Sequence, residues 1–232
     1  MKKTVTHSAG KLSLAAGALA LLTSCQSHGE VPARTITRQV IAATLPPDVT
    51  DNHPHAPAIR FVLANNIMIP ERDGLFHPEV AVTRGALLQI LMDAAHIEPT
   101  SPVTRDPFPD VSRFHPQAGY VLRALEMEIV RGYQDGPFRG QFRIDRIVSL
   151  IETLKVLLLT QGIDINNLPR GTSFTDVPAG EWYEGVGLYA QQHHLVDAHP
   201  DGSMGRDDPM TRAAIAEVIW RFLHQRLAPR LR

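Results

Sequence analysis

The chain repeats one pattern of residues three times, and the distances inside the pattern are constant. Each copy has an Asp-Val pair, an Asp-Gly pair 25 residues after the first Asp, and an Arg 36 residues after it. The copies are Asp48-Val49, Asp73-Gly74 and Arg84; Asp110-Val111, Asp135-Gly136 and Arg146; and Asp176-Val177, Asp201-Gly202 and Arg212. Such self-similarity is typical of a repeat protein, in which neighbouring units share a core that no single unit forms alone.

Residues around these markers resemble the S-layer homology (SLH) domain, whose pattern runs approximately FxDVxxxxW, GYxDGxFxP and TRAE. The second copy reads Phe108-Pro-Asp-Val111 and Gly132-Tyr-Gln-Asp-Gly-Pro-Phe-Arg139. The third copy reads Phe174-Thr-Asp-Val177, with Trp182 after it, and later Met210-Thr-Arg-Ala213. The resemblance extends over residues 46–227. It implies three helix-loop-helix repeats that form a pseudo-threefold prism around a shared helical core.

Several positions depart from the family pattern. The Trp is kept only as Trp182. When the Arg 36 residues after the first Asp is taken as the Arg of TRAE, the acidic residue of that motif is replaced by Ala86, Val148 and Ala214. The Gly that ends the first helix in the family is Asn66, Glu128 and His194 here, of which Asn alone readily adopts a left-handed conformation. The implied fold is unaffected, whereas the number of working grooves between repeats is left open.

The spacing of apolar residues predicts a mainly helical chain with two helices in each copy. In the second copy, Ala118, Val121, Leu122 and Leu125 follow a 3.6-residue rhythm, which predicts a helix over residues 115–130. Second helices are predicted at 83–95, 145–162 and 211–227, each of which opens on a residue favoured at the N-cap. The Pro-, Thr-, Asn- and Gly-containing linkers at 97–107 and 163–173 separate predicted repeats at 46–97, 108–163 and 174–228.

The first 25 residues have the layout of a bacterial lipoprotein signal peptide. Basic residues precede an apolar run of about 11 residues, and Leu22-Thr-Ser-Cys25 resembles a lipobox. The run is too short to span a bilayer, which takes about 20 residues. We therefore expect residues 1–24 to be cleaved, the only Cys of the chain, Cys25, to carry the lipid, and residues 25–45 to form a linker. Gln26 stands where bacterial lipoproteins retained in the inner membrane have Asp, so this resemblance implies the outer membrane if the bacterium has two membranes and otherwise the outer face of the cytoplasmic membrane.

Composition and motifs exclude several classes of function. Without residues 1–24 the chain has 20 Lys and Arg against 24 Asp and Glu, which argues against a nucleic-acid partner. Of those 20 basic residues only Lys155 is a Lys, a bias explained either by genome composition or by selection for planar anion-binding groups. The His residues follow no metal-binding or catalytic motif, and we expect no metal, no cofactor and no enzyme activity. The histidines spaced closely enough to suggest a metal site are His53 with His55, and His193-His194 with His199 nearby.

Arginine recurs in the predicted first turn of each second helix. The N-terminus of a helix favours anions, so a cation repeated there suggests that the guanidinium and the free backbone N–H groups bind an anion together. The alternative is that each Arg pairs with an Asp inside the protein and clamps two repeats together. The resemblance implies that the Arg lies in a groove between repeats and contacts an anionic sugar substituent, commonly a pyruvate ketal. Candidate ligand-binding residues are Arg84, Arg146, Arg212, Asp73, Gly74, Asp135, Gly136, Asp201, Gly202, Trp182 and Tyr133.

The expected function is therefore that of a non-catalytic envelope lipoprotein. It would bind a cell-wall polysaccharide or peptidoglycan through the grooves and reach the membrane through the lipid on Cys25, so that it tethers one to the other. Arg212 and Arg146 are expected to contribute most, because their copies keep more of the family pattern, and Arg84 least. The alternative is a module for protein–protein contact or self-assembly in the envelope, without glycan binding.

Overall fold

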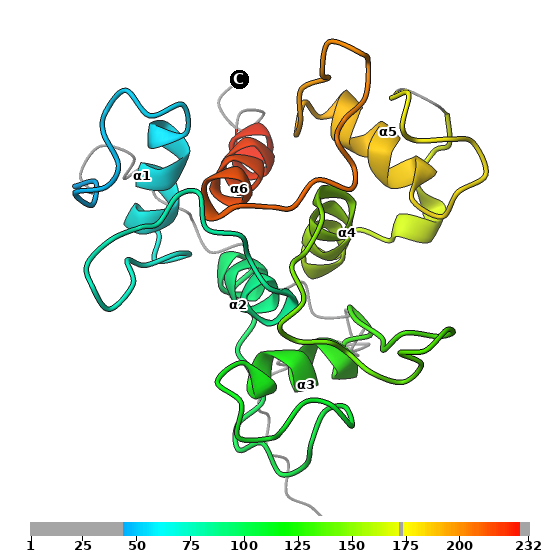
Figure 1. Ribbon diagram of the computed structural model, residues 1–232. Helices are drawn as coiled ribbons and strands as arrows, with labels where there is room; N and C mark the ends of the chain where they lie inside the picture. Colours follow the sequence, from blue (N-terminus) through cyan, green and yellow to red (C-terminus); the bar gives the residue numbers. More distant parts are fainter. Residues whose placement is uncertain (1–43, 172–173, 228–232) are drawn as a thin grey trace, which may run out of the picture. The chain divides into compact units, whose positions relative to one another are not determined.

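The computed structural model describes residues 44–171 and 174–227, and the described chain is mainly helical, as predicted (Figure 1). In those two stretches the only extended pairing consists of isolated β-bridges. The arrangement of the repeats as a pseudo-threefold prism stays a prediction. The elements are α1 (Ala56–Ala64), α2 (Arg84–Ala94), α3 (Ala118–Glu126), α4 (Leu150–Thr160), a 3-10 helix η1 (Ile165–Asn167), α5 (Glu184–Gln192) and α6 (Arg212–Leu227).

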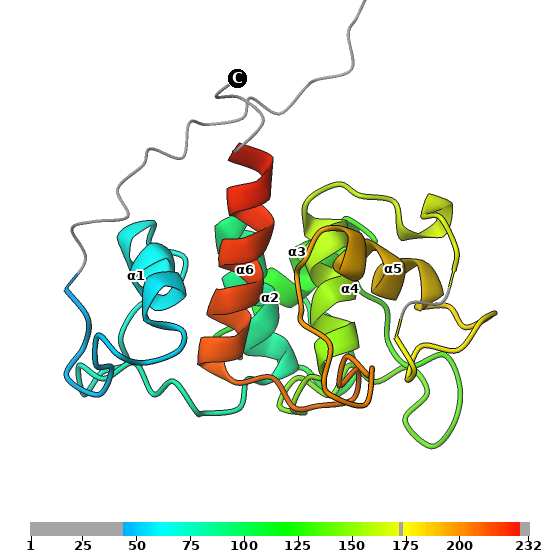
Figure 2. The same cartoon turned by 90° about the horizontal axis from the view of Figure 1, so that it is seen from above.

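We refer to residues 46–97, 108–163 and 174–227 as the first, second and third segments. Each contributes a first helix (α1, α3, α5) and a second helix (α2, α4, α6). The first helix of one segment packs against the second helix of another: α3 against α2, α5 against α4, and α1 against α6. Figures 1 and 2 show α2, α4 and α6 side by side, each with one of the first helices against it. The segments therefore exchange packing surfaces, and α1 and α6 join the first segment to the third.

Short first helices end in a left-handed residue. Asn66, Glu128 and His194 have φ of 54°, 57° and 45°, so all three adopt the conformation for which the family uses Gly. Each is followed by a buried apolar residue whose N–H folds back onto the helix, as in the Schellman motif. These bonds are Ile67 N–H to Val62 (2.9 Å), Ile129 N–H to Ala124 (2.9 Å) and Leu195 N–H to Ala190 (2.8 Å). The side chain that stabilises the turn is the apolar one, which lets Glu and His stand where Gly is usual.

The Asp of each Asp-Val pair ties the start of a segment to the end of its loop. Its two carboxylate oxygens accept backbone N–H groups from the far side of the loop, while the adjacent Val is buried. Donors are Phe76 (2.9 Å) and His77 (2.6 Å) for Asp48, Phe142 (2.8 Å) and Arg143 (2.7 Å) for Asp110, and Met204 (2.9 Å) and Arg206 (2.8 Å) for Asp176. The three anchors show which residues correspond between the segments.

These anchors correct the register of the second segment. The first donor lies 28 residues after Asp48 but 32 residues after Asp110, so the second loop is four residues longer than the first. Helix α4 begins at Leu150 behind a Ser149 N-cap, and the predicted start at Asp145 is wrong. Leu150, not Arg146, therefore corresponds to Arg84. The acidic residue that was expected to be missing from every copy is present in the second segment as Glu152.

A closed set of backbone hydrogen bonds links the three segments just before their second helices. Val82 N–H donates to Met210, Met210 N–H donates to Val148, and Val148 N–H donates back to Val82 at 2.9–3.0 Å. Beneath this set the second helices bury large side chains, among them Leu87, Leu91, Leu154, Leu157, Ile219 and Phe222. The common core lies here. Within the described residues, no helix is both long and apolar enough to cross a membrane.

Candidate functional site

The N–H groups at the starts of the second helices already have partners. The first N–H of each helix donates to a backbone carbonyl of a neighbouring segment, and the hydroxyls of Thr83 and Thr211 accept the third N–H of α2 and α6. The first-residue bonds are Arg84 to Arg146 (2.9 Å), Leu150 to Asp208 (3.1 Å) and Arg212 to Val80 (3.0 Å). An anion at a helix N-terminus needs free N–H groups. The hypothesis that free N–H groups join the arginines in binding an anion is therefore wrong.

Arg212 is a clamp between α6 and the first segment. Its Nε donates to the carbonyl of Phe76 (2.7 Å), Nη2 donates to the carbonyl of Ile69 (2.9 Å), and Nη1 lies 3.1 Å from a carboxylate oxygen of Glu71. The guanidinium also lies over the ring of Phe76, with 4.8 Å from Cζ to the centroid. Every nitrogen of the guanidinium has a partner. This geometry supports the internal clamp for Arg212.

Arg146 precedes α4 and lies outside its first turn. Its Nη2 contacts the carboxylate of Glu152, whereas its Nε is buried and has no hydrogen-bond partner among the residues that the structure describes. Glu152 belongs to a capping box, in which it also accepts the N–H of Ser149 (3.1 Å). Arg146 therefore neutralises the residue that caps α4.

Arg84 borders a cavity. Its Nε donates to the carbonyl of Phe142 (3.0 Å), and its Nη1 lies 3.4 Å from Glu152. The guanidinium also faces the ring of Phe142 (4.6 Å) and, farther away, that of Tyr133 (5.8 Å). No hydrogen bond found in the described residues uses Nη2. Arg84 therefore keeps donors for a ligand.

The cavity has a volume of about 450 Å³ and is built from all three segments. Its apolar walls include Val130, which lies after the end of α3, and Val156 and Leu159 of α4. Its polar groups include Arg84, Glu128, Arg131, Glu152, Lys155 and Trp182. Apolar walls with a few converging polar groups are the usual form of a site for a small ligand or a saccharide unit.

Lys155 and Trp182 meet at this cavity. The Lys155 ammonium lies 4.6 Å from the centroid of the indole ring of Trp182, which is 51% exposed. Burial lowers the pKa of Lys155, and the guanidiniums of Arg84 and Arg131 lower it further, against the opposing charge of Glu152. The sequence predicted Trp182 as a ligand-binding residue but did not predict Lys155 or Arg131. The available signal was that Lys155 is the only Lys after residue 24.

The Asp-Gly pairs form turns and do not line the cavity. Gly74, Gly136 and Gly202 have φ of 81°, 69° and 81°, a region that suits Gly. The Asp73 and Asp201 carboxylates accept the N–H groups of Leu75 (3.0 Å) and Ser203 (2.9 Å), and Asp135 is exposed. The pairs therefore shape the loops. Of the predicted ligand-binding residues, the structure brings Arg84 and Trp182 to the cavity and places Tyr133 beside Arg84.

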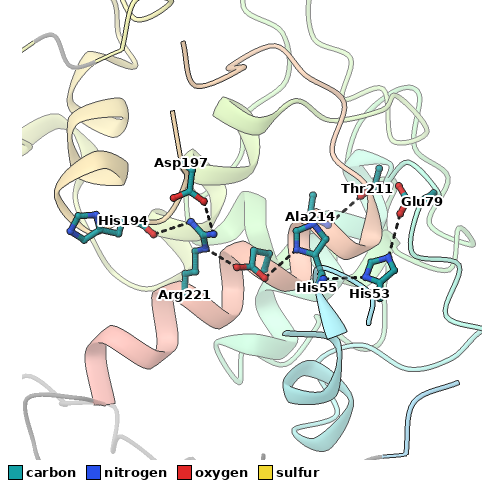
Figure 3. A network of polar contacts seen from close by, with 9 residues as sticks. His53, His55, Glu79, His194, Asp197, Thr211, Ala214 and Arg221 are labelled. Atoms are coloured by element: carbon teal, nitrogen blue, oxygen red, sulfur yellow. Dashed lines mark hydrogen bonds and ion pairs between the residues drawn. The ribbon is translucent and has the colours of Figure 1, made fainter. Parts of the chain in front are cut away.

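Two of the candidate metal-binding histidines, His53 and His55, lie beside acids (Figure 3). His55 Nδ1 lies 3.2 Å from Glu217, and His53 Nε2 lies 3.5 Å from Glu79. Across residues 44–171 and 174–227, no three side chains of His, Cys, Asp or Glu gather as a metal site would require. Cys25, the predicted lipid site, lies outside the described residues.

Two regions of the chain match a known domain family. The model of the S-layer homology domain matches residues 47–88 and 107–147. The cellulosome-anchoring protein of Acetivibrio thermocellus is 29% identical over 98 residues, which cover 41% of this chain and 21% of that protein. Cell surface glycoprotein 1 of the same organism is 30% identical over 95 residues, 40% of this chain and 4% of that protein. The chain spans only a small part of the length of these relatives.

Proposed function

We propose that this protein is a non-catalytic module of the cell envelope that binds an anionic cell-wall polymer. Support comes from the two regions that match the S-layer homology domain and from the similarity to a protein named for anchoring. The third segment is proposed as a third repeat of the same kind. It has the same Asp anchor, at Asp176, and the same backbone bonds to its neighbours as the two matched segments.

The cavity beside Arg84 is the proposed binding site. One observation carries this assignment: three groups suited to an anionic sugar line the same cavity. They are the guanidinium of Arg84, which has an unused nitrogen, the ammonium of Lys155 and the exposed indole of Trp182. The two cations suit a carboxylate or phosphate. An indole ring offers an apolar face to the C–H groups of a sugar. Arg212 and Arg146 are assigned structural roles, because their contacts are made within the protein.

Attachment to a membrane completes the proposed role. A lipid on Cys25 would hold one end of the chain in a bilayer while the cavity holds the wall, so the protein would act as a tether in the envelope. The roughly 20 residues between Cys25 and Pro46 extend at most about 70 Å, at about 3.3–3.6 Å per residue. The wall-binding site therefore has to work close to the membrane.

Co-sedimentation of the full-length protein with purified sacculi tests this function. We expect binding to intact sacculi and loss of binding when their secondary polymers are removed. Arg84→Met should bind more weakly when binding is compared below its melting transition, which should itself fall because the carbonyl of the buried Phe142 loses its donor. A change at an exposed arginine, Arg139→Ala, should bind like the wild type. Binding that survives removal of the polymers would assign peptidoglycan as the ligand. Failure to bind intact sacculi would reject the proposal in favour of a protein partner.

A further inference from the structure

One position in each second helix faces the first helix of another segment, and its chemistry differs among the three. This position lies six residues after the N-caps Thr83, Ser149 and Thr211. The residues that occupy it are Gln89, Lys155 and Glu217. A side chain that faces another segment at the same place in every copy allows a direct comparison of the three contacts.

Two of these contacts are satisfied inside the protein. Gln89 accepts a hydrogen bond from Gln117 at the N-cap of α3 (3.4 Å). Glu217 binds His55 at the N-cap of α1 (3.2 Å) and also Arg221 one turn further along α6 (2.7 Å). The polar groups of Gln89 and Glu217 are therefore used to join helices.

Lys155 has no such partner. Its ammonium carries three donors, and within the described residues no hydrogen bond or ion pair reaches it; its contact is the Trp182 ring. The acid whose charge acts on Lys155 is already shared, because Glu152 contacts both Arg146 and Arg84. A partly buried cation without an acceptor is unfavourable, and a bound anion would remove this cost.

We propose that Lys155 is the specificity-determining residue of the cavity, and that it binds one anionic oxygen group of the wall polymer together with Arg84. The inference rests on the proposed function and adds to it. Carboxylate and phosphate share the required chemistry, since both accept hydrogen bonds from an ammonium and a guanidinium. Gln89 and the ion-paired Glu217 offer no spare cation at the corresponding positions. Of the three corresponding positions, only that of α4 therefore supplies a cation for such a group.

The test measures binding of the full-length protein to intact sacculi as a function of pH. Lys155→Met keeps the length of the side chain but removes the charge, and should weaken binding roughly ten- to hundredfold at neutral pH. Lys155→Arg should retain binding. Gln89→Met, the same type of change at the matching position of α2, should leave binding unchanged. Sacculi depleted of phosphate-linked polymers separate a phosphate source from a carboxylate source.

The pH profile separates a ligand contact from a structural role. Because the pKa of Lys155 lies below that of an ordinary lysine, wild-type binding should fall as the pH rises, before a free lysine would lose its proton. Binding by Lys155→Arg should persist over the same pH range. Equal binding by wild type and Lys155→Met, or a flat wild-type profile over the range in which the protein stays folded, would overturn the inference and leave the proposed function standing. Absence of wild-type binding would overturn both.

Discussion

Replacing Arg212 with Ala should destabilise the protein without removing the ligand site. The Arg212 side chain is 12% exposed, and its loss removes the partner of the carbonyl of Phe76, a residue that is fully buried. A buried acceptor left without a donor costs about 1–3 kcal/mol. Ile69 is exposed, so water replaces the donor to its carbonyl and the loss there is about 0.5–1 kcal/mol. The half-exposed Glu71 adds at most about 1 kcal/mol, because solvent screens it.

The expected total is thus about 3 kcal/mol, which corresponds to a melting temperature lower by roughly 6–12 °C for a domain of this size. Thermal unfolding followed by circular dichroism measures the shift. Arg139→Ala, a change of the same kind at an exposed position, should stay within about 0.5 kcal/mol of the wild type. Below the melting transition, Arg212→Ala should still bind sacculi. An unchanged melting temperature combined with lost binding would refute the clamp and return Arg212 to the ligand site.

Three further predictions concern acid stability, the contact between the outer segments and the lipid. Burial raises the pKa of Asp176, but the backbone N–H donors of Arg206 and Met204 lower it more, so the pKa lies below the 3.8 of an ordinary Asp. The ionised Asp176 therefore stabilises the fold above pH 3.8, and this stabilisation is lost as the pH falls further. Urea unfolding at pH 6 and pH 2.5 measures the loss, which should be smaller for Asp176→Asn. Deletion of residues 163–232 removes the helix on which α1 packs, and the remaining fragment should aggregate or melt without cooperativity; a sharp, monomeric melting transition would contradict the shared core. Changing Cys25 to Ser should abolish lipid labelling, and normal processing of that variant would contradict the lipoprotein hypothesis.

The sequence predicted the helices and the turns well because both depend on local patterns. The apolar rhythm and N-cap residues located α2 and α6, and the Asp-Gly pairs located loops that do have left-handed glycines. The register of the second segment was mispredicted for a physical reason: its loop has four additional residues, and Arg146 happens to stand where constant spacing requires an Arg. The residues that correspond between segments are fixed by backbone hydrogen bonds to Asp110. These bonds join residues far apart in the sequence, and no residue at a constant spacing indicates them.

The candidate site was predicted only in part, because it depends on contacts between segments. Arg84 and Trp182 belong to the repeated pattern and were selected from it. Lys155 and Arg131 do not recur, so a search for repetition passes over them. Burial, neighbouring charges and the lack of an acceptor among the described residues make Lys155 distinctive, and these properties arise where the three segments meet around one cavity.

The packing of α1 against α6 also restricts the order in which the chain can fold. Residues of α1 are made early in synthesis, yet the surface that covers them belongs to a helix more than 150 residues later. Contacts between such distant segments slow folding, because a long loop must close before they form. Until α6 emerges, the buried face of α1, with Ile59 and Phe61, has no place to dock. The nascent chain therefore cannot complete this part of its core until α6 has been made.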